Sequence, residues 1–140
     1  MTDPRPTQLK LHKASRRLEV TFDDGQHYQL PAEYLRVFSP SAEVRGHGSG
    51  PMILVVDKEK VGIERIEPVG NYAVRLIFDD GHDTGLYTWK VLRELGEQQV
   101  ANWQAYLDRL AEAGQARKGE PVTYHPASTK GPTSNEGGAA

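Results

Sequence analysis

Five histidines and the absence of cysteine limit the chemistry that this chain can carry. A non-haem iron oxygenase needs two histidines and one carboxylate on one face of the metal, and the first pair usually reads His-x-Asp or His-x-Glu. No acidic residue stands two positions after any of the histidines, which are His12, His27, His47, His82 and His125. Without thiols, cysteine nucleophiles and thiolate-bound zinc or iron–sulfur clusters are excluded. The pattern therefore argues against an oxygenase centre in this chain alone.

Serine, carboxylate and glycine patterns give no catalytic motif. The serines of the Gly/Pro-rich stretch lack the Gly-x-Ser-x-Gly elbow of a hydrolase, and these are Ser39, Ser41 and Ser49. The pairs Asp23-Asp24 and Asp79-Asp80 each precede a glycine, as is typical of turns. The alternating glycines of residues 46–50 are not followed by the Lys-Ser or Lys-Thr of a phosphate loop. We therefore expect a protein that is not an enzyme.

Strand and helix patterns show which elements must position these residues. Apolar and polar residues alternate over residues 9–12, 18–22 and 72–78, and another strand is expected over residues 61–67, before a proline. Two of these runs close with Asp-Gly, which favours a tight hairpin.

Helices are expected after each hairpin, because Pro31 suits a first helical position and Thr88 can cap a second helix that Gly96 would end. A third helix is indicated by apolar residues at helical spacing over residues 100–110.

A short internal repeat organises these elements. Residues 22–25 read FDDG and recur at residues 78–81, and the Leu-Arg pair at 35–36 recurs at 92–93 with a slip of one position. Two ββα-like halves predict an α+β fold, a two-layer sandwich in which an antiparallel sheet has its helices packed on one face.

The ordered domain is expected to span residues 7–114, between disordered ends at residues 1–6 and 115–140. Residues 39–51 form a long Gly/Pro-rich connection, which is either a binding loop that presents Arg45 and His47 or a flexible connector.

Charge and hydropathy narrow the partners. The net charge is −2 with basic and acidic residues interspersed, which favours neither nucleic acid nor an anionic membrane. The longest apolar run, residues 53–56, is too short to cross a bilayer. We expect a cytoplasmic protein, in keeping with the lack of cysteine and of a signal-like N-terminus.

Three segments resemble one known family. Residues 35–48 read LRVFSPSAEVRGHG, residues 69–73 read VGNYA, and residues 78–89 read FDDGHDTGLYTW. Together they resemble the DUF971 family, also called the gamma-butyrobetaine hydroxylase-like N-terminal domain, over residues 7–114. The resemblance implies a compact α+β module that precedes the catalytic domain of iron- and 2-oxoglutarate-dependent oxygenases. The same module also occurs in the family as a protein that stands alone or is fused to a P-loop ATPase of iron–sulfur cluster assembly.

The resemblance also implies a metal-binding position. In the oxygenases the family's domain binds structural zinc through three cysteines and one histidine, and His82 matches that histidine. The cysteine-bearing stretch falls near residues 39–44, where this chain has no cysteine. Because His82 matches the family's histidine, the resemblance still implies zinc or iron as a cofactor, with His82 as the candidate ligand.

Two functional hypotheses follow. The first is a non-catalytic interaction module that serves an iron–sulfur assembly ATPase or an iron enzyme, through a partner-facing patch of Arg45, His47, His82 and Tyr87. The second is a metal-binding accessory protein or a stand-alone homologue of the oxygenases' N-terminal domain. Trp89 is expected in the core rather than in the patch. The sequence does not give the oligomeric state.

Overall fold

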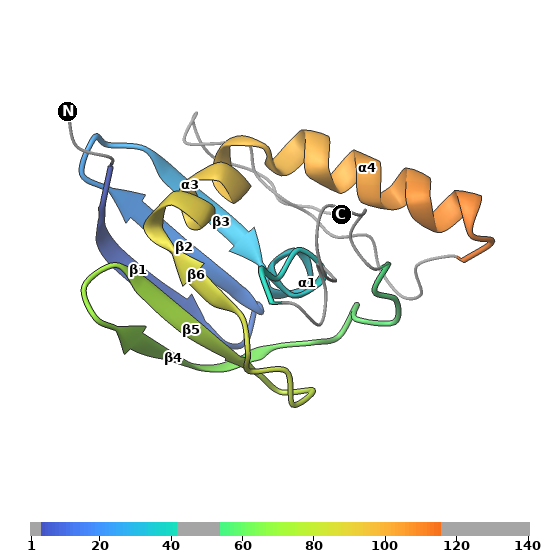
Figure 1. Ribbon diagram of the computed structural model, residues 1–140, viewed down its shortest axis with the longest axis horizontal. Helices are drawn as coiled ribbons and strands as arrows, with labels where there is room; N and C mark the ends of the chain where they lie inside the picture. The colour runs from blue at the N-terminus through green and yellow to red at the C-terminus, as the bar shows by residue number, and fades with distance from the viewer. Residues whose placement is uncertain (1–3, 42–53, 116–140) are drawn as a thin grey trace.

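The computed structural model describes residues 4–41 and 54–115. Each half of the described chain contributes three strands and then a helix, and a further helix follows (Figure 1). The first half holds β1 (Pro6–His12), β2 (Arg17–Phe22), β3 (His27–Pro31) and α1 (Ala32–Val37). The second half holds β4 (Ile63–Val69), β5 (Ala73–Phe78), β6 (Leu86–Thr88) and α3 (Trp89–Glu97), before α4 (Gln99–Glu112).

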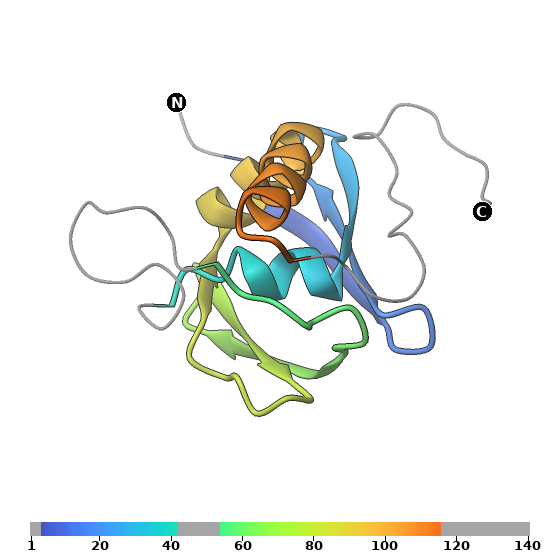
Figure 2. The same cartoon turned by 90° about the vertical axis from the view of Figure 1, so that its right-hand side faces the viewer.

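The strands form two antiparallel sheets of three strands, in the orders β1-β2-β3 and β4-β5-β6. The predicted α+β fold is confirmed, with two similar halves, but the antiparallel strands form two separate sheets where a single sheet was expected. Each half completes its own sheet, and α1 lies between the two sheets (Figure 2). Most of α1 is therefore buried, including Tyr34 and Leu35.

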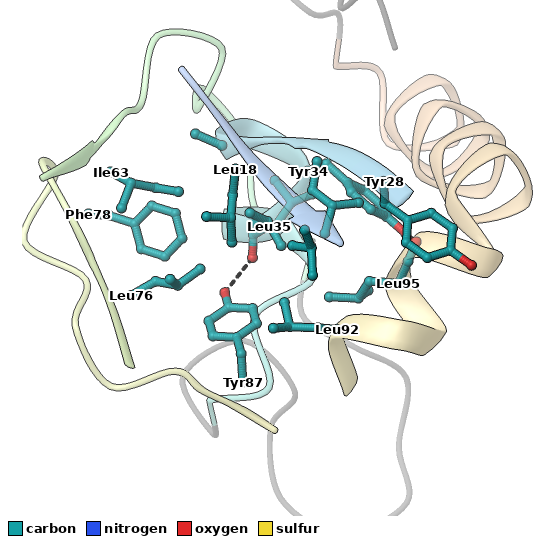
Figure 3. Packing of buried hydrophobic residues seen from close by; sticks show 14 of the residues in the cluster. Leu18, Tyr28, Tyr34, Leu35, Ile63, Leu76, Phe78, Tyr87, Leu92 and Leu95 are labelled. Atoms are coloured by element: carbon teal, nitrogen blue, oxygen red, sulfur yellow. Dashed lines mark hydrogen bonds between the residues drawn. The ribbon is translucent and has the colours of Figure 1, made fainter. Parts of the chain in front are cut away.

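The core is continuous through both halves (Figure 3). Alternating residues of β2 and β3 point inward, as their spacing predicts, and they meet the inward residues of β5. Two tyrosine hydroxyls join the halves by donating to backbone carbonyls: Tyr34 donates to Leu95 O at 2.6 Å, and Tyr87 donates to Leu35 O at 2.6 Å. Each hydroxyl satisfies a buried carbonyl as well as itself.

Two element boundaries differ from the sequence prediction. The strand expected to stop before Pro68 continues through it to Val69, because β4 is an edge strand whose outer side needs no backbone donor. Gly96 does not end α3, which runs to Glu97. Instead Gly96 is buried against the Tyr28 ring, where a Cβ would lie 2.6 Å from the nearest ring atom.

The third helix is confirmed as α4, whose buried residues include Trp103, Tyr106 and Leu110. None of the helices in the described part of the chain has the length and apolar character needed to cross a bilayer. The predicted disordered tail after residue 115 and most of the long connection lie outside the described residues.

Candidate functional site

His82 lies inside the protein, next to the end of α1. The residue is only 5% exposed, and its Nε2 lies within hydrogen-bond distance of Ser39 Oγ, at 2.9 Å. The Ser41 amide donates to the same Ser39 oxygen at 3.2 Å. Ser41 Oγ in turn lies 2.6 Å from Thr84 Oγ1. We call these four residues, Ser39, Ser41, His82 and Thr84, the hydroxyl–imidazole cluster.

The second hairpin turn places His82 in this cluster. Gly81 has a φ of +92°, which an L side chain rarely adopts, and its amide donates to Phe78 O at 3.2 Å. The Phe78 amide then donates to His82 O at 3.0 Å. The predicted Asp-Gly turn is thus present, and it turns the imidazole inward toward Ser39.

Gly85 allows the hairpin to approach the end of α1. A Cβ at Gly85 would lie 2.5 Å from Ser39 Oγ and 2.9 Å from the Tyr87 ring. Any larger residue would push Ser39 away from His82. The close approach of the Gly85 backbone to these two side chains therefore requires glycine at this position.

Asp80 anchors the same turn through charge. Its Oδ2 lies 2.9 Å from Arg36 Nε and 2.7 Å from Lys58 Nζ, and its Oδ1 accepts the His82 amide at 3.1 Å. Burial raises the pKa of this carboxyl, but the hydrogen bonds from Lys58, the His82 amide and Arg36 outweigh burial and lower the pKa to about 2. The carboxyl is therefore ionised across the physiological range and ties the turn to α1.

The expected partner-facing patch needs correction at Tyr87 and His82. Tyr87 is 0% exposed, because its ring fills the core and its hydroxyl serves Leu35 O (Figure 3). His82 is nearly as buried. Neither side chain offers a surface in this structure. Arg45 and His47 lie outside the described residues.

Trp89 is half-buried rather than wholly in the core. It packs against the core cluster, and its Nε1 donates to Asn71 O at 2.9 Å. Arg5 Nη2 donates to the same carbonyl at 2.9 Å. The indole therefore closes one corner of the fold, where the turn between β4 and β5 meets α3.

The sequence prediction missed the residues that surround His82. The sequence offers Ser39 and Ser41 only as nucleophiles, and no chemical motif points to Thr84, Arg36 or Lys58. The signal in the sequence is the family pattern, because residues 35–48 contain Ser39 and Ser41 and residues 78–89 contain His82 and Thr84.

The hydroxyl–imidazole cluster does not fit zinc. Structural zinc takes thiolate, imidazole or carboxylate ligands, and neutral hydroxyls are poor substitutes. The His82 ring nitrogen contacts the Ser39 hydroxyl, and the other side-chain oxygens of the cluster are the hydroxyls of Ser41 and Thr84. Nor do residues 4–41 and 54–115 contain any group of three or more His, Cys, Asp or Glu that could hold a metal ion.

A second group of histidines lies far from this cluster, on the outer face of the first sheet. Glu19 bridges His12 Nε2 at 2.7 Å and His27 Nε2 at 2.9 Å. The hydrogen bond from His12 lowers the pKa of Glu19, although partial burial opposes that shift. The two histidine side chains are about one-third exposed and the Glu19 side chain is 20% exposed, and the three stabilise the sheet through cross-strand pairs.

Similar proteins place this arrangement in a family. A family model described as gamma-butyrobetaine hydroxylase-like, N-terminal, matches residues 9–93. No curated protein matches the chain.

The solved structures that are similar to the chain include two NMR structures and one crystal structure. One protein, solved by NMR, is 53% identical with a TM-score of 0.73, and the match covers 89% of this chain and 98% of that one. Another NMR structure is 45% identical with a TM-score of 0.73, over 86% of this chain and 95% of that one. A crystal structure from Acidithiobacillus ferrooxidans is 40% identical with a TM-score of 0.56, over 67% of this chain and 97% of that one. That protein is described as having unknown function and as a member of the DUF971 family.

These matches, together with the turn and helix segments that carry the family pattern, identify the chain as a member of the DUF971 family, the gamma-butyrobetaine hydroxylase-like N-terminal domains.

Proposed function

We propose that this protein is a non-catalytic interaction module that serves an iron–sulfur cluster assembly or iron-enzyme system. One observation carries the proposal. The best-placed candidate for chemistry, the Ser39–His82 pair, is closed inside the fold, with Ser39 0% exposed and His82 5% exposed.

A serine hydrogen-bonded to a histidine is the geometry of a nucleophile and its base. A nucleophile also has to reach a substrate carbonyl, and Ser39 is buried with its oxygen already accepting the Ser41 amide. The pair instead joins the end of α1 to the second hairpin. Its role is to hold the backbone at the start of the connection that carries Arg45 and His47.

The proposed partner-binding residues are Arg45 and His47, with the hydroxyl–imidazole cluster as their support. Arginine is enriched at protein interfaces because its planar guanidinium makes several hydrogen bonds and stacks on flat groups. The partner class comes from the family resemblance, in which related modules are fused to a cluster-assembly ATPase or to an iron oxygenase.

Purification at native expression level tests this proposal. The untagged wild-type protein and the variant Arg45→Ala/His47→Ala are each recovered with an antibody. The proteins that co-purify with them are then compared. We expect a cluster-assembly ATPase or an iron enzyme to be enriched with the wild type and lost with the double variant. The matched control Arg75→Ala/His12→Ala removes the same residue types elsewhere and should keep the partner. Identical partner lists for all three proteins would contradict the proposal.

The metal-binding alternative makes a different prediction. Protein purified without an affinity tag would contain stoichiometric zinc or iron, and His82→Ala would lose it. The hydroxyl partner of His82, Ser39, gives this alternative no support. Metal analysis of the untagged protein separates the two hypotheses.

A further inference from the structure

A surface cavity lies beside the second hairpin turn, which contributes Asp79 to its lining. This cavity of about 310 Å³ opens between the β1–β2 turn and the start of β4. Its charged lining is contributed by both halves of the chain and consists of Lys13, Arg16, Lys60, Glu64 and Asp79. The volume is at the lower end of the range for small-molecule sites.

The three cations of this cavity lack internal partners within the described ranges. Lys13, Arg16 and Lys60 form no ion pair with any residue of 4–41 or 54–115. The cations next to them behave differently, because Lys58 and Arg36 both pair with Asp80. The charge inside the cavity is therefore available for a ligand.

The backbone at Arg16 is a second, independent observation. Arg16 has a φ of +54°, in the left-handed region that favours glycine. Its amide donates to Lys13 O at 3.2 Å and its carbonyl accepts the Ala32 amide at 2.8 Å, so the turn fixes this conformation. Glycine would meet the backbone requirement at lower cost. An arginine kept in such a conformation points to a task for its side chain.

Gly62 forms the floor of the cavity and brings its two walls together. A Cβ there would lie 3.0 Å from Asp79 Oδ2 and 3.6 Å from Arg16 Cγ. The Arg16 side chain and the Asp79 carboxylate thus lie over the same glycine. A ligand between them would meet a cation and a hydrogen-bond acceptor at once.

We infer that this cavity binds a small phosphate ester that carries hydroxyl groups. Lys13, Arg16 and Lys60 hold the phosphate, for which arginine and lysine are the usual protein donors. Asp79 and Glu64 accept hydrogen bonds from the hydroxyls. The same two carboxylates repel an extended polyanion, so nucleic acid and an anionic membrane fit this cavity poorly.

The test is an NMR titration of the ¹⁵N-labelled full chain in phosphate-free buffer at constant ionic strength. Inorganic phosphate and glycerol phosphate are added separately, and anionic vesicles form a third arm. We expect saturable shifts of the Arg16, Gly62 and Asp79 amides with both small anions. Glycerol phosphate should bind more tightly, and vesicles should produce no such shifts. The inference would be overturned if neither small anion produced saturable shifts, or if the vesicles bound more strongly than the small anions.

Arg16→Gly separates binding from folding. Because the backbone at this position suits glycine, the variant should keep or raise the thermal midpoint and yet bind glycerol phosphate at least fivefold more weakly. Lys60→Gln should weaken binding to a similar extent without altering the turn. Lys90→Gln, on the exposed surface of α3, is the matched control and should bind as the wild type does. Wild-type affinity in both Arg16→Gly and Lys60→Gln would contradict the site.

Discussion

The two halves of the molecule are built to the same plan and are tied to each other crosswise. Arg93 of α3 holds Asp24 of the first hairpin turn with contacts of 3.0 and 2.8 Å, and Arg36 of α1 holds Asp80 of the second turn at 2.9 Å. Each turn ends at a glycine with a φ near +90°, +89° at Gly25 and +92° at Gly81. Each helix therefore anchors the hairpin of the other half.

The halves differ in what fills the space beside each turn. In the first half the Tyr28 ring covers Gly96 of α3, which makes an apolar contact. In the second half Gly85 leaves that space open, and Ser39 meets His82 there. The comparison teaches that the first hairpin is closed by an aromatic ring, whereas the second is closed by the hydroxyl–imidazole cluster. The hydroxyl–imidazole cluster, which supports the proposed partner-binding residues, joins this second hairpin to the end of α1.

The largest effect is expected where backbone and side chain approach most closely. Gly96→Ala should destabilise the protein by about 2–3 kcal/mol, because the new Cβ would overlap the Tyr28 ring. This loss exceeds the gain of about 1 kcal/mol that alanine normally brings to a helix interior. Gly85→Ala should cost a similar amount in the second half. Chemical denaturation measures the free energy of unfolding of both variants, with Lys90→Ala as the control. If Gly96→Ala unfolds with the wild-type free energy, the Tyr28 ring can move away from the new Cβ.

Next in size is the effect of removing the charge from the second turn. Asp80→Asn should cost about 2 kcal/mol, because Arg36 and Lys58 are left without their shared carboxylate and the Arg36 side chain is only 12% exposed. Asp24→Asn should cost clearly less. Asp24 is 41% exposed, and Arg93 keeps Glu97 and its stacking on the Phe22 ring. Urea denaturation measures the free energy of unfolding of both variants. Equal losses in Asp80→Asn and Asp24→Asn would remove the distinction between the halves.

The sequence predicted the repeated plan but not this difference. Alternation, the Asp-Gly turns and the family pattern were sufficient for the strands, the hairpins and the fold class, because those features depend on local spacing. The Tyr28–Gly96 and Ser39–His82 contacts join residues far apart in the chain. The prediction for Tyr87 was wrong for a related reason. An aromatic residue next to a polar turn is compatible with either surface or core, and the contact with Leu35 that places Tyr87 in the core is also distant in the chain.

A smaller loss is expected from opening the hydroxyl–imidazole cluster. Ser39→Ala removes the partner of His82 Nε2 and of the Ser41 amide, which should cost about 1–2 kcal/mol because both groups are buried. Lys90, which is exposed on α3, should tolerate alanine within about 0.5 kcal/mol. Thermal denaturation checks both. An unaffected midpoint in Ser39→Ala would mean that the cluster does not support the fold.

The smallest effect is the acid sensitivity of the second turn. The pKa of Asp80 is about 2 in the folded protein and 3.8 for an ordinary aspartate, so its ionised form stabilises the fold above pH 3.8. That contribution is lost as the pH falls from about 4 toward 2, and allowing for solvent screening we expect about 1 kcal/mol. The stability gap between the wild type and Asp80→Asn should therefore narrow by that amount between pH 5 and pH 2. Asp24 and Glu19, whose pKa values are also lowered, keep titrating in both proteins and cancel in the difference. A gap that stayed constant with pH would show that Arg36 and Lys58 do not depend on the Asp80 charge.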